Sequence, residues 1–211
     1  MDTSQMQTND GIYYRFRDRD GLEIRVRPET PADAAHLVDL FGHLGPTSRY
    51  LRFSKVMDNP DPARVRAEAE RLAQLGPPRD MAWLAFADLP DEPDAPIAGA
   101  RYDRLSADTA ELAISVRDDM QRRGIGSELL RFITEKARQE GIHRLVATFR
   151  AENRAVWALF GHSPYPVTWE IHGAEVDAVI DLTAGSQLCL IIASSSALPV
   201  TFGLDLTQRV A

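Results

Sequence analysis

The chain has 211 residues, 44% of them hydrophobic, which is enough to bury one sizeable core. Its formal net charge of −7 argues against a nucleic-acid-binding protein, because phosphate backbones favour basic surfaces. The single cysteine, Cys189, excludes an intrachain disulfide and indicates a reducing compartment. Residues 1–20 lack the apolar core of a signal peptide and no apolar run could span a bilayer, so we expect a cytoplasmic protein without a membrane partner.

Hydrophobic periodicity and turn residues predict the N-terminal elements. Residues 1–11 are polar and are expected to be mobile. A hairpin is predicted over 13–16 and 22–26. A helix is predicted to follow it, with Thr30 as its cap and Pro31 at its first position. A second helix is predicted over 60–75 and a strongly apolar strand over 81–87. Residues 90–96 are acidic and rich in proline, which predicts a loop.

The C-terminal half continues with alternating strands and helices. Strands are predicted over 97–105, 109–117, 144–149, 167–171 and 176–182, with helices starting at Ile125 and around Asn153. Residues 184–211 form an extension of unknown role. Within it, 188–192 are apolar enough to need covering, by an added strand or by the partner subunit of a homodimer.

Residues 116–127 join the predicted strand 109–117 to the helix that starts at Ile125. Gly124 and Gly126 let the backbone approach a ligand, and the new helix directs free N–H groups and its positive dipole end toward it. Arg122 and Arg123 add positive charge. This pattern predicts an anion site suited to a pyrophosphate. The alternative is an ordinary turn whose glycines serve its geometry.

Two better-known phosphate-binding patterns do not fit this turn. No Gly-x-x-x-x-Gly-Lys string followed by Ser or Thr occurs, which excludes a P-loop. A Rossmann fingerprint would need a third glycine where Leu129 stands, and the acidic residue Glu140 lies inside the predicted helix rather than at a strand end. A different phosphate ligand is therefore indicated.

The string Gln121-Arg122-Arg123-Gly124-Ile125-Gly126 resembles the acetyl-CoA signature of the GNAT superfamily of N-acetyltransferases, Gln/Arg-x-x-Gly-x-Gly/Ala. The likeness spans about residues 23–183. Near its start, residues 48–53 look like the loop ahead of the second helix in Pat-type protein lysine acetyltransferases. The resemblance implies the α/β (α+β) GNAT acyl-CoA N-acyltransferase fold, a mixed central sheet flanked by helices, within one domain over 12–183.

Acetyl transfer to an amine requires a proton acceptor, because only about one lysine-like amine in 10³ to 10⁴ is neutral at pH 7. Glu111 is our candidate general base. It shares one face of the predicted strand 109–117 with Ala113 and Ser115, which leave room for a ligand. The alternative is a solvated glutamate on the wet face. The resemblance favours the base, since Ala110-Glu111-Leu112-Ala113 matches the Ala-Glu-x-Ala string of the Pat-type catalytic glutamate.

The resemblance also implies how acetyl-CoA would be held. The backbone over 114–116 would bind the pantetheine, with the Val116 N–H polarising the thioester carbonyl, and 121–127 would hold the pyrophosphate. Asn153 would help to hold the pantetheine, or would only cap its helix. The cofactor-binding residues expected are Ile114, Val116, Gln121, Arg122, Arg123, Gly124, Ile125, Gly126, Ser127 and Asn153.

One residue departs from the family pattern. Many members place a tyrosine that protonates the leaving thiolate where this chain has Phe160, and Tyr165 falls where the family has a packing aromatic. The five histidines show no metal-ligand spacing, so no metal is expected.

The function expected is an acetyl-CoA-dependent N-acetyltransferase. A small amine or a protein lysine would be the acceptor, the latter in an open acidic cleft to which 88–94 could contribute. The alternative is a degenerate acyl-CoA-binding sensor that acts through a protein partner; the altered general-acid position and the unmatched C-terminal extension favour it.

Overall fold

The computed structural model describes residues 13–184, and the expectations for 1–11 and for the extension beyond residue 184 lie outside this range. The described chain forms one eight-stranded sheet in the order β1-β2-β3-β4-β5-β6-β8-β7, in which only β5 and β6 are parallel. The strands are β1 (Tyr14–Arg17), β2 (Glu23–Pro28), β3 (Asp80–Leu89), β4 (Glu92–Arg104), β5 (Thr109–Val116), β6 (Arg144–Arg150), β7 (Val167–His172) and β8 (Glu175–Asp181). The predicted mixed sheet is confirmed.

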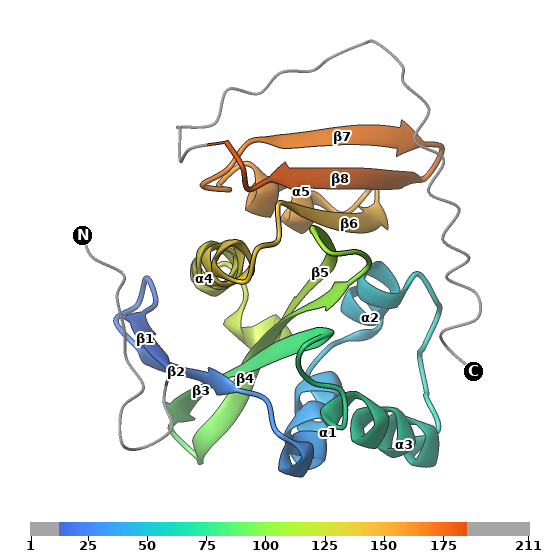
Figure 1. The fold of residues 1–211 in the computed structure, drawn as a ribbon. Coiled ribbons are helices and arrows are strands. Elements are labelled where there is room, and N and C mark those ends of the chain that lie inside the picture. The colour runs from blue at the N-terminus through green and yellow to red at the C-terminus, as the bar shows by residue number, and fades with distance from the viewer. Residues whose placement is uncertain (1–12, 185–211) are drawn as a thin grey trace.

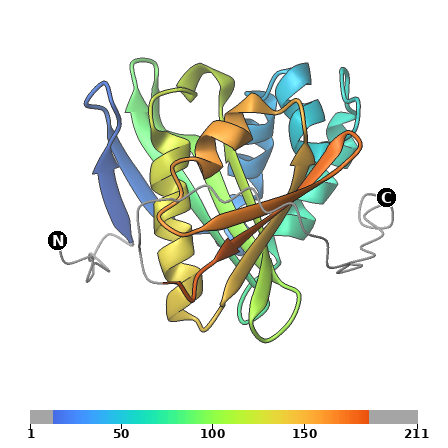
Figure 2. The same cartoon turned by 90° about the horizontal axis from the view of Figure 1, so that it is seen from above.

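Helices cover both faces of the sheet (Figure 1, Figure 2). The helices are α1 (Ala34–Gly42), α2 (Pro46–Phe53), α3 (Pro62–Ala73), α4 (Ile125–Gln139) and α5 (Arg154–Phe160). The first three lie on one face and α4 lies on the other. The predicted helices and the predicted N-terminal and C-terminal hairpins are all present.

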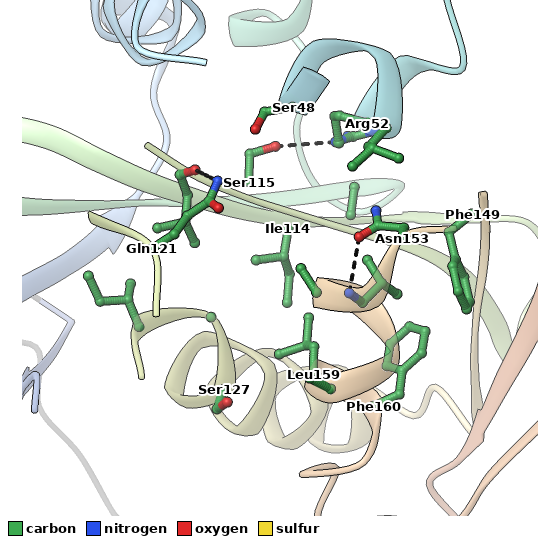
Figure 3. A pocket seen from close by; sticks show the side chains of 18 of the residues that line it. Ser48, Arg52, Ile114, Ser115, Gln121, Ser127, Phe149, Asn153, Leu159 and Phe160 are labelled. Atoms are coloured by element: carbon green, nitrogen blue, oxygen red, sulfur yellow. Dashed lines mark hydrogen bonds between the residues drawn. The ribbon is translucent and has the colours of Figure 1, made fainter. Parts of the chain in front are cut away.

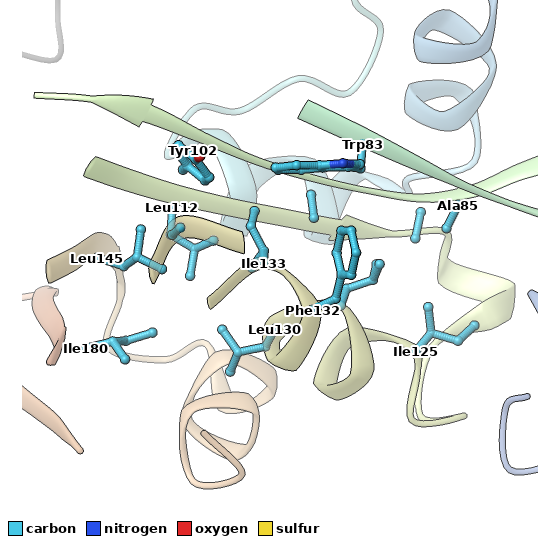
Figure 4. Close-up of a cluster of buried hydrophobic side chains, with 14 of the residues drawn as sticks. Trp83, Ala85, Tyr102, Leu112, Ile125, Leu130, Phe132, Ile133, Leu145 and Ile180 are labelled. Carbon is cyan, nitrogen blue, oxygen red and sulfur yellow. The ribbon is translucent and has the colours of Figure 1, made fainter. Parts of the chain in front are cut away.

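The larger core lies between α4 and the sheet (Figure 4). The residues of α4 that face the sheet recur at helical spacing and are at most 1% exposed: Ile125, Leu129, Leu130 and Ile133. They pack with Trp83 and Tyr102. Burying each such side chain contributes about 1.5–3 kcal/mol, so this stripe fixes α4, and the turn before it, against the sheet.

Two predictions about loops were wrong. Residues 48–53 lie within α2, which begins at Pro46 in the first helical position and ends where Ser54 adopts a left-handed conformation. Residues 90–96 mostly belong to β4, which pairs with β3 across a tight turn. Both failures have a physical cause: α2 has no fully buried residue to mark its face, and the acidic groups that suggested a loop are paired with arginines.

The sheet opens between β5 and β6. These strands pair only where 109–111 meet 144–146, and β5 then continues along β4 while β6 continues along β8. Beyond Glu111 and Val146, the facing backbones of β5 and β6 no longer bond to each other. Backbone groups without a ladder partner are free to bind a ligand.

Candidate active site

A cavity of about 460 Å³ lies where β5 and β6 separate. Its walls come from α2, β5, the turn before α4, β6 and α5 (Figure 3). The expected cofactor-binding residues that line it are Ile114, Val116, Gln121, Arg122, Gly124, Ile125, Gly126, Ser127 and Asn153. Glu111 and Arg123 are not among the lining residues.

The turn before α4 is built as an anion site. Gly124 is the N-cap with φ 87°, a left-handed conformation that glycine adopts without strain. The first N–H groups of a helix have no acceptor within it, which leaves those of Ile125, Gly126 and Ser127 directed at the cavity end. Gln121 holds the turn to β5, donating from Nε2 to the Val116 carbonyl at 3.2 Å and to Asp118 at 3.0 Å.

Arg123 anchors the N-terminal hairpin instead of facing the cavity. Its Nε lies 2.7 Å from Asp18, whose side chain is fully buried, and 3.0 Å from Asp20. This contact brings Arg19 to the site. The Arg19 N–H donates to the Arg123 carbonyl at 3.0 Å, and its Nε lies 3.4 Å from where a Cβ on Gly124 would be. Arg19 lines the cavity, and sequence reasoning did not identify it.

Asn153 caps α5 and lines the cavity as well. Its side-chain oxygen accepts from the Val156 N–H at 3.2 Å, while its NH₂ group has no protein partner among the described residues. Phe160 is buried and packs edge-to-face with Phe149 at 5.7 Å. Tyr165 is also buried, and its hydroxyl donates to Glu135 rather than facing the cavity.

Glu111 lies beyond the cavity end, on the sheet face that carries Ala113 and Ser115, which both line the cavity. It is half-buried and pairs with Val146, the last pairing before β5 and β6 separate. The carboxylate therefore sits on the strand that forms the cavity wall, at the point where the gap begins.

The acidic wall expected for a lysine acceptor does not form. Asp88 and Asp94 pair with Arg25 at 2.8 and 2.9 Å, and Glu92 pairs with Arg117 at 3.0 Å. Among the residues described, no aspartate or glutamate lines the cavity. Its charged lining consists of arginines: Arg19, Arg52 and Arg122. Arg52 and Ser48 of α2 were missed because 48–53 were interpreted only as a family likeness.

His43 lies beside two carboxylates, although the spacing of the histidines in the sequence does not suggest a metal site. Ligand atoms of Asp39, His43 and Glu92 lie within 4.8 Å of one another. Arg117 already binds Glu92, and the His43 Nδ1 lies 3.0 Å from the Asp39 backbone carbonyl. The group is thus committed to protein contacts.

Comparison with known proteins identifies the family. The sequence profile of the acetyltransferase (GNAT) family matches residues 50–162. The chain therefore belongs to the GNAT acetyltransferase family, whose members carry out acetyl-CoA-dependent N-acetylation. None of the helices in the described part of the chain is long and apolar enough to cross a bilayer.

Individual relatives agree with this assignment. The GNAT domain of Streptomyces lividans PAT superposes with a TM-score of 0.69 at 26% identity, covering 83% of this chain and 99% of that one. An acetyltransferase of Pseudomonas aeruginosa is 25% identical over 65% of this chain and 72% of its own length. An L-methionine sulfoximine/L-methionine sulfone acetyltransferase of the same species is 31% identical, over only 36% of this chain and 45% of its own length.

Proposed function

We propose that this protein transfers the acetyl group of acetyl-CoA to a primary amine by direct attack, with Glu111 as general base. The observation that carries the proposal is the gap between β5 and β6, which joins the anion site at the start of α4 to the strand bearing Glu111. Arg19, Arg122 and the free helix amides fit a ligand with a negatively charged phosphate end.

The cosubstrate would be held at two places. Its pyrophosphate would accept hydrogen bonds from the N–H groups of Ile125, Gly126 and Ser127, with Arg122 and Arg19 contributing charge. Arg123 would act indirectly, because its guanidinium is already paired with Asp18 and Asp20. The pantetheine would bind the free NH₂ of Asn153 and the backbone over 114–116 on the side that faces β6, where β5 has no pairing strand.

The reaction needs a neutral amine and a polarised carbonyl. Glu111 would take the proton of the acceptor amine through a water, because the carboxylate does not itself line the cavity. The amine nitrogen then bonds to the acetyl carbon as the carbon–sulfur bond breaks. The Val116 N–H would stabilise the carbonyl oxygen. Water would protonate the leaving thiolate, since Phe160 has no proton to give.

Glu111→Gln tests this mechanism, with release of free CoA thiol as the assay and acetyl-CoA affinity measured by calorimetry. Removing the base should lower kcat by about 10²- to 10⁴-fold with affinity unchanged. Glu175→Gln, an exposed change on β8, is the matched control and should behave as the wild type. Equal rates for Glu111→Gln and wild type would exclude Glu111 as the base.

A sensor function remains the competing hypothesis, because the position of the family's tyrosine is filled by the buried Phe160. The same assay separates the two: tight acetyl-CoA binding without thiol release for any amine would favour the sensor.

A further inference from the structure

Arg52 is a guanidinium on the acceptor side of the cavity, with no ion pair among the described residues and with the charge of Glu111 acting on it. It lies on α2, above the face of β5 that carries Glu111, and its Nε donates to the Ser115 hydroxyl at 3.2 Å (Figure 3). Ser48, one helical turn earlier, lines the same wall. No ion pair and no hydrogen bond of the terminal guanidinium nitrogens is found within the described residues, so these donors are free for a ligand.

Nearby carboxylates on this side are already taken by another arginine. Arg101, which pairs with Ala113 across β4 and β5, lies 2.9 Å from Glu29 and 3.8 Å from Asp80. Burial raises the pKa of both carboxyls above the usual range, and the Arg101 charge offsets only part of this rise. Since Glu29 and Asp80 are both held by Arg101 and neither lines the cavity, Arg52 supplies the charge on this part of the cavity wall.

This charge distribution bears on the kind of amine that can bind. A lysine side chain brings only a cation near its reacting nitrogen, and Arg52 would repel it. An amine that also carries a carboxylate would offer a partner for the guanidinium fork. Glu111 and Ser115, the hydrogen-bond partner of Arg52, lie on the same strand on either side of Ala113, so one small molecule could meet both Glu111 and Arg52.

We infer that the acceptor is a free amino acid, or a close analogue with a compact oxyanion, whose anionic group binds Arg52 while its amine faces Glu111. This inference rests on the proposed acetyl transfer and narrows its acceptor. Ser115 is a positioning residue in this arrangement, because it holds the Arg52 Nε and leaves the outer nitrogens for the ligand.

The test uses the full chain with acetyl-CoA and follows thiol release over matched acceptors. These are free amino acids, the same amino acids as carboxamides, and lysine-containing peptides with blocked ends. We expect free amino acids to be preferred over their amides. Arg52→Gln should raise the KM for amino acids by about tenfold to hundredfold, leave kcat and acetyl-CoA affinity nearly unchanged, and remove the preference. Arg52→Lys should restore part of it.

Lys55→Gln, just after α2, makes the same charge change outside the cavity lining and should leave the preference intact. Thermal unfolding of each variant checks that it is folded. Better turnover of lysine peptides than of free amino acids, or an unchanged preference in Arg52→Gln, would overturn the inference while acetyl transfer stands. No thiol release with any amine would overturn the proposed function itself, and the inference with it.

Discussion

Arg122 and Arg123 are neighbours with opposite surroundings. Arg122 has φ 63° and lines the cavity, whereas Arg123 turns away to the buried carboxylate of Asp18. The second pair fastens the turn between β1 and β2 to the anion site and delivers Arg19 to its rim. A residue outside the family-matched segment 50–162 thus adds a third charge to the cavity.

Arg19→Ala should weaken acetyl-CoA binding. Because Arg19 is exposed, the loss should stay near 1 kcal/mol, about fivefold to tenfold in Kd measured by calorimetry. Arg17→Ala removes the same charge from the same hairpin, at a side chain that pairs with Glu23, and should have little effect. An equal loss in both variants would mean that only net charge matters.

The sequence could identify the residues whose constraints are local. The glycines of the turn are set by backbone geometry, and the alternation of β5 correctly grouped Glu111 with Ala113 and Ser115. The role of Arg123 could not be predicted, because its partner Asp18 is distant in sequence. Nothing in the sequence distinguishes it from the adjacent Arg122. Arg52 was missed for a related reason: its role depends on how α2 sits over β5.

At the level of elements, the start of α1 shows how charge fixes a helix. A 3-10 turn, Pro31–Asp33, precedes α1, and Asp33 accepts from the Thr30 N–H at 2.7 Å and from Arg27 at 2.6 and 2.8 Å. Burial alone would raise the pKa of Asp33, but the hydrogen bonds from Arg27, Thr30 and His36 hold it well below its usual range. The sequence analysis predicted the roles of Thr30 and Pro31 at the start of this helix, but it did not predict the role of Asp33.

Asp33→Asn should destabilise the protein in a pH-dependent way. A carboxyl that is more acidic in the folded than in the unfolded state contributes stability above its unfolded pKa and loses it as the pH falls toward the folded value. Urea unfolding at pH 7 should show a loss of about 2 kcal/mol, shrinking below about pH 4. Asp91→Asn, in an exposed turn, should change little at either pH. A pH-independent loss would contradict this account.

The sequence missed helix α2 because its pattern marks no buried face. The helix α2 has no fully buried residue, and its arginines lie over aromatic rings, Arg49 over Phe41 and Arg52 over Phe53. In strands β3 and β5, in contrast, most of the residues that become buried are apolar ones, and both strands were predicted nearly to the residue. Local hydrophobicity predicts the elements that pack on the core with a clear pattern, and it fails for α2, which covers the cavity.

At the scale of the whole molecule, the sheet is two parts joined by the short pairing of β5 with β6. One part holds β1 to β5 and the other β6 to β8. The gap is the least bonded region of the sheet, and a ligand there would connect both parts.

Acetyl-CoA should therefore stabilise the whole chain. At 100 times its Kd a ligand adds about 2.7 kcal/mol, which for this size raises Tm by about 5–10 °C. Hydrogen exchange should slow at the gap-facing amides of 113–116 and 147–150. Pantetheine alone, lacking the phosphates, should protect less. Protection confined to the hairpin β7–β8 would place the ligand elsewhere.

The order of strands also limits where the chain could be shortened. A fragment covering only the family-matched residues 50–162 would lose β1, β2, β7 and β8. Interior strands β3 and β6 would then become edges, and β3 carries five consecutive buried residues over 83–87. Long apolar edges recruit other chains, so such a fragment should aggregate rather than fold. Anyone trimming this enzyme for crystallisation should keep both outer hairpins.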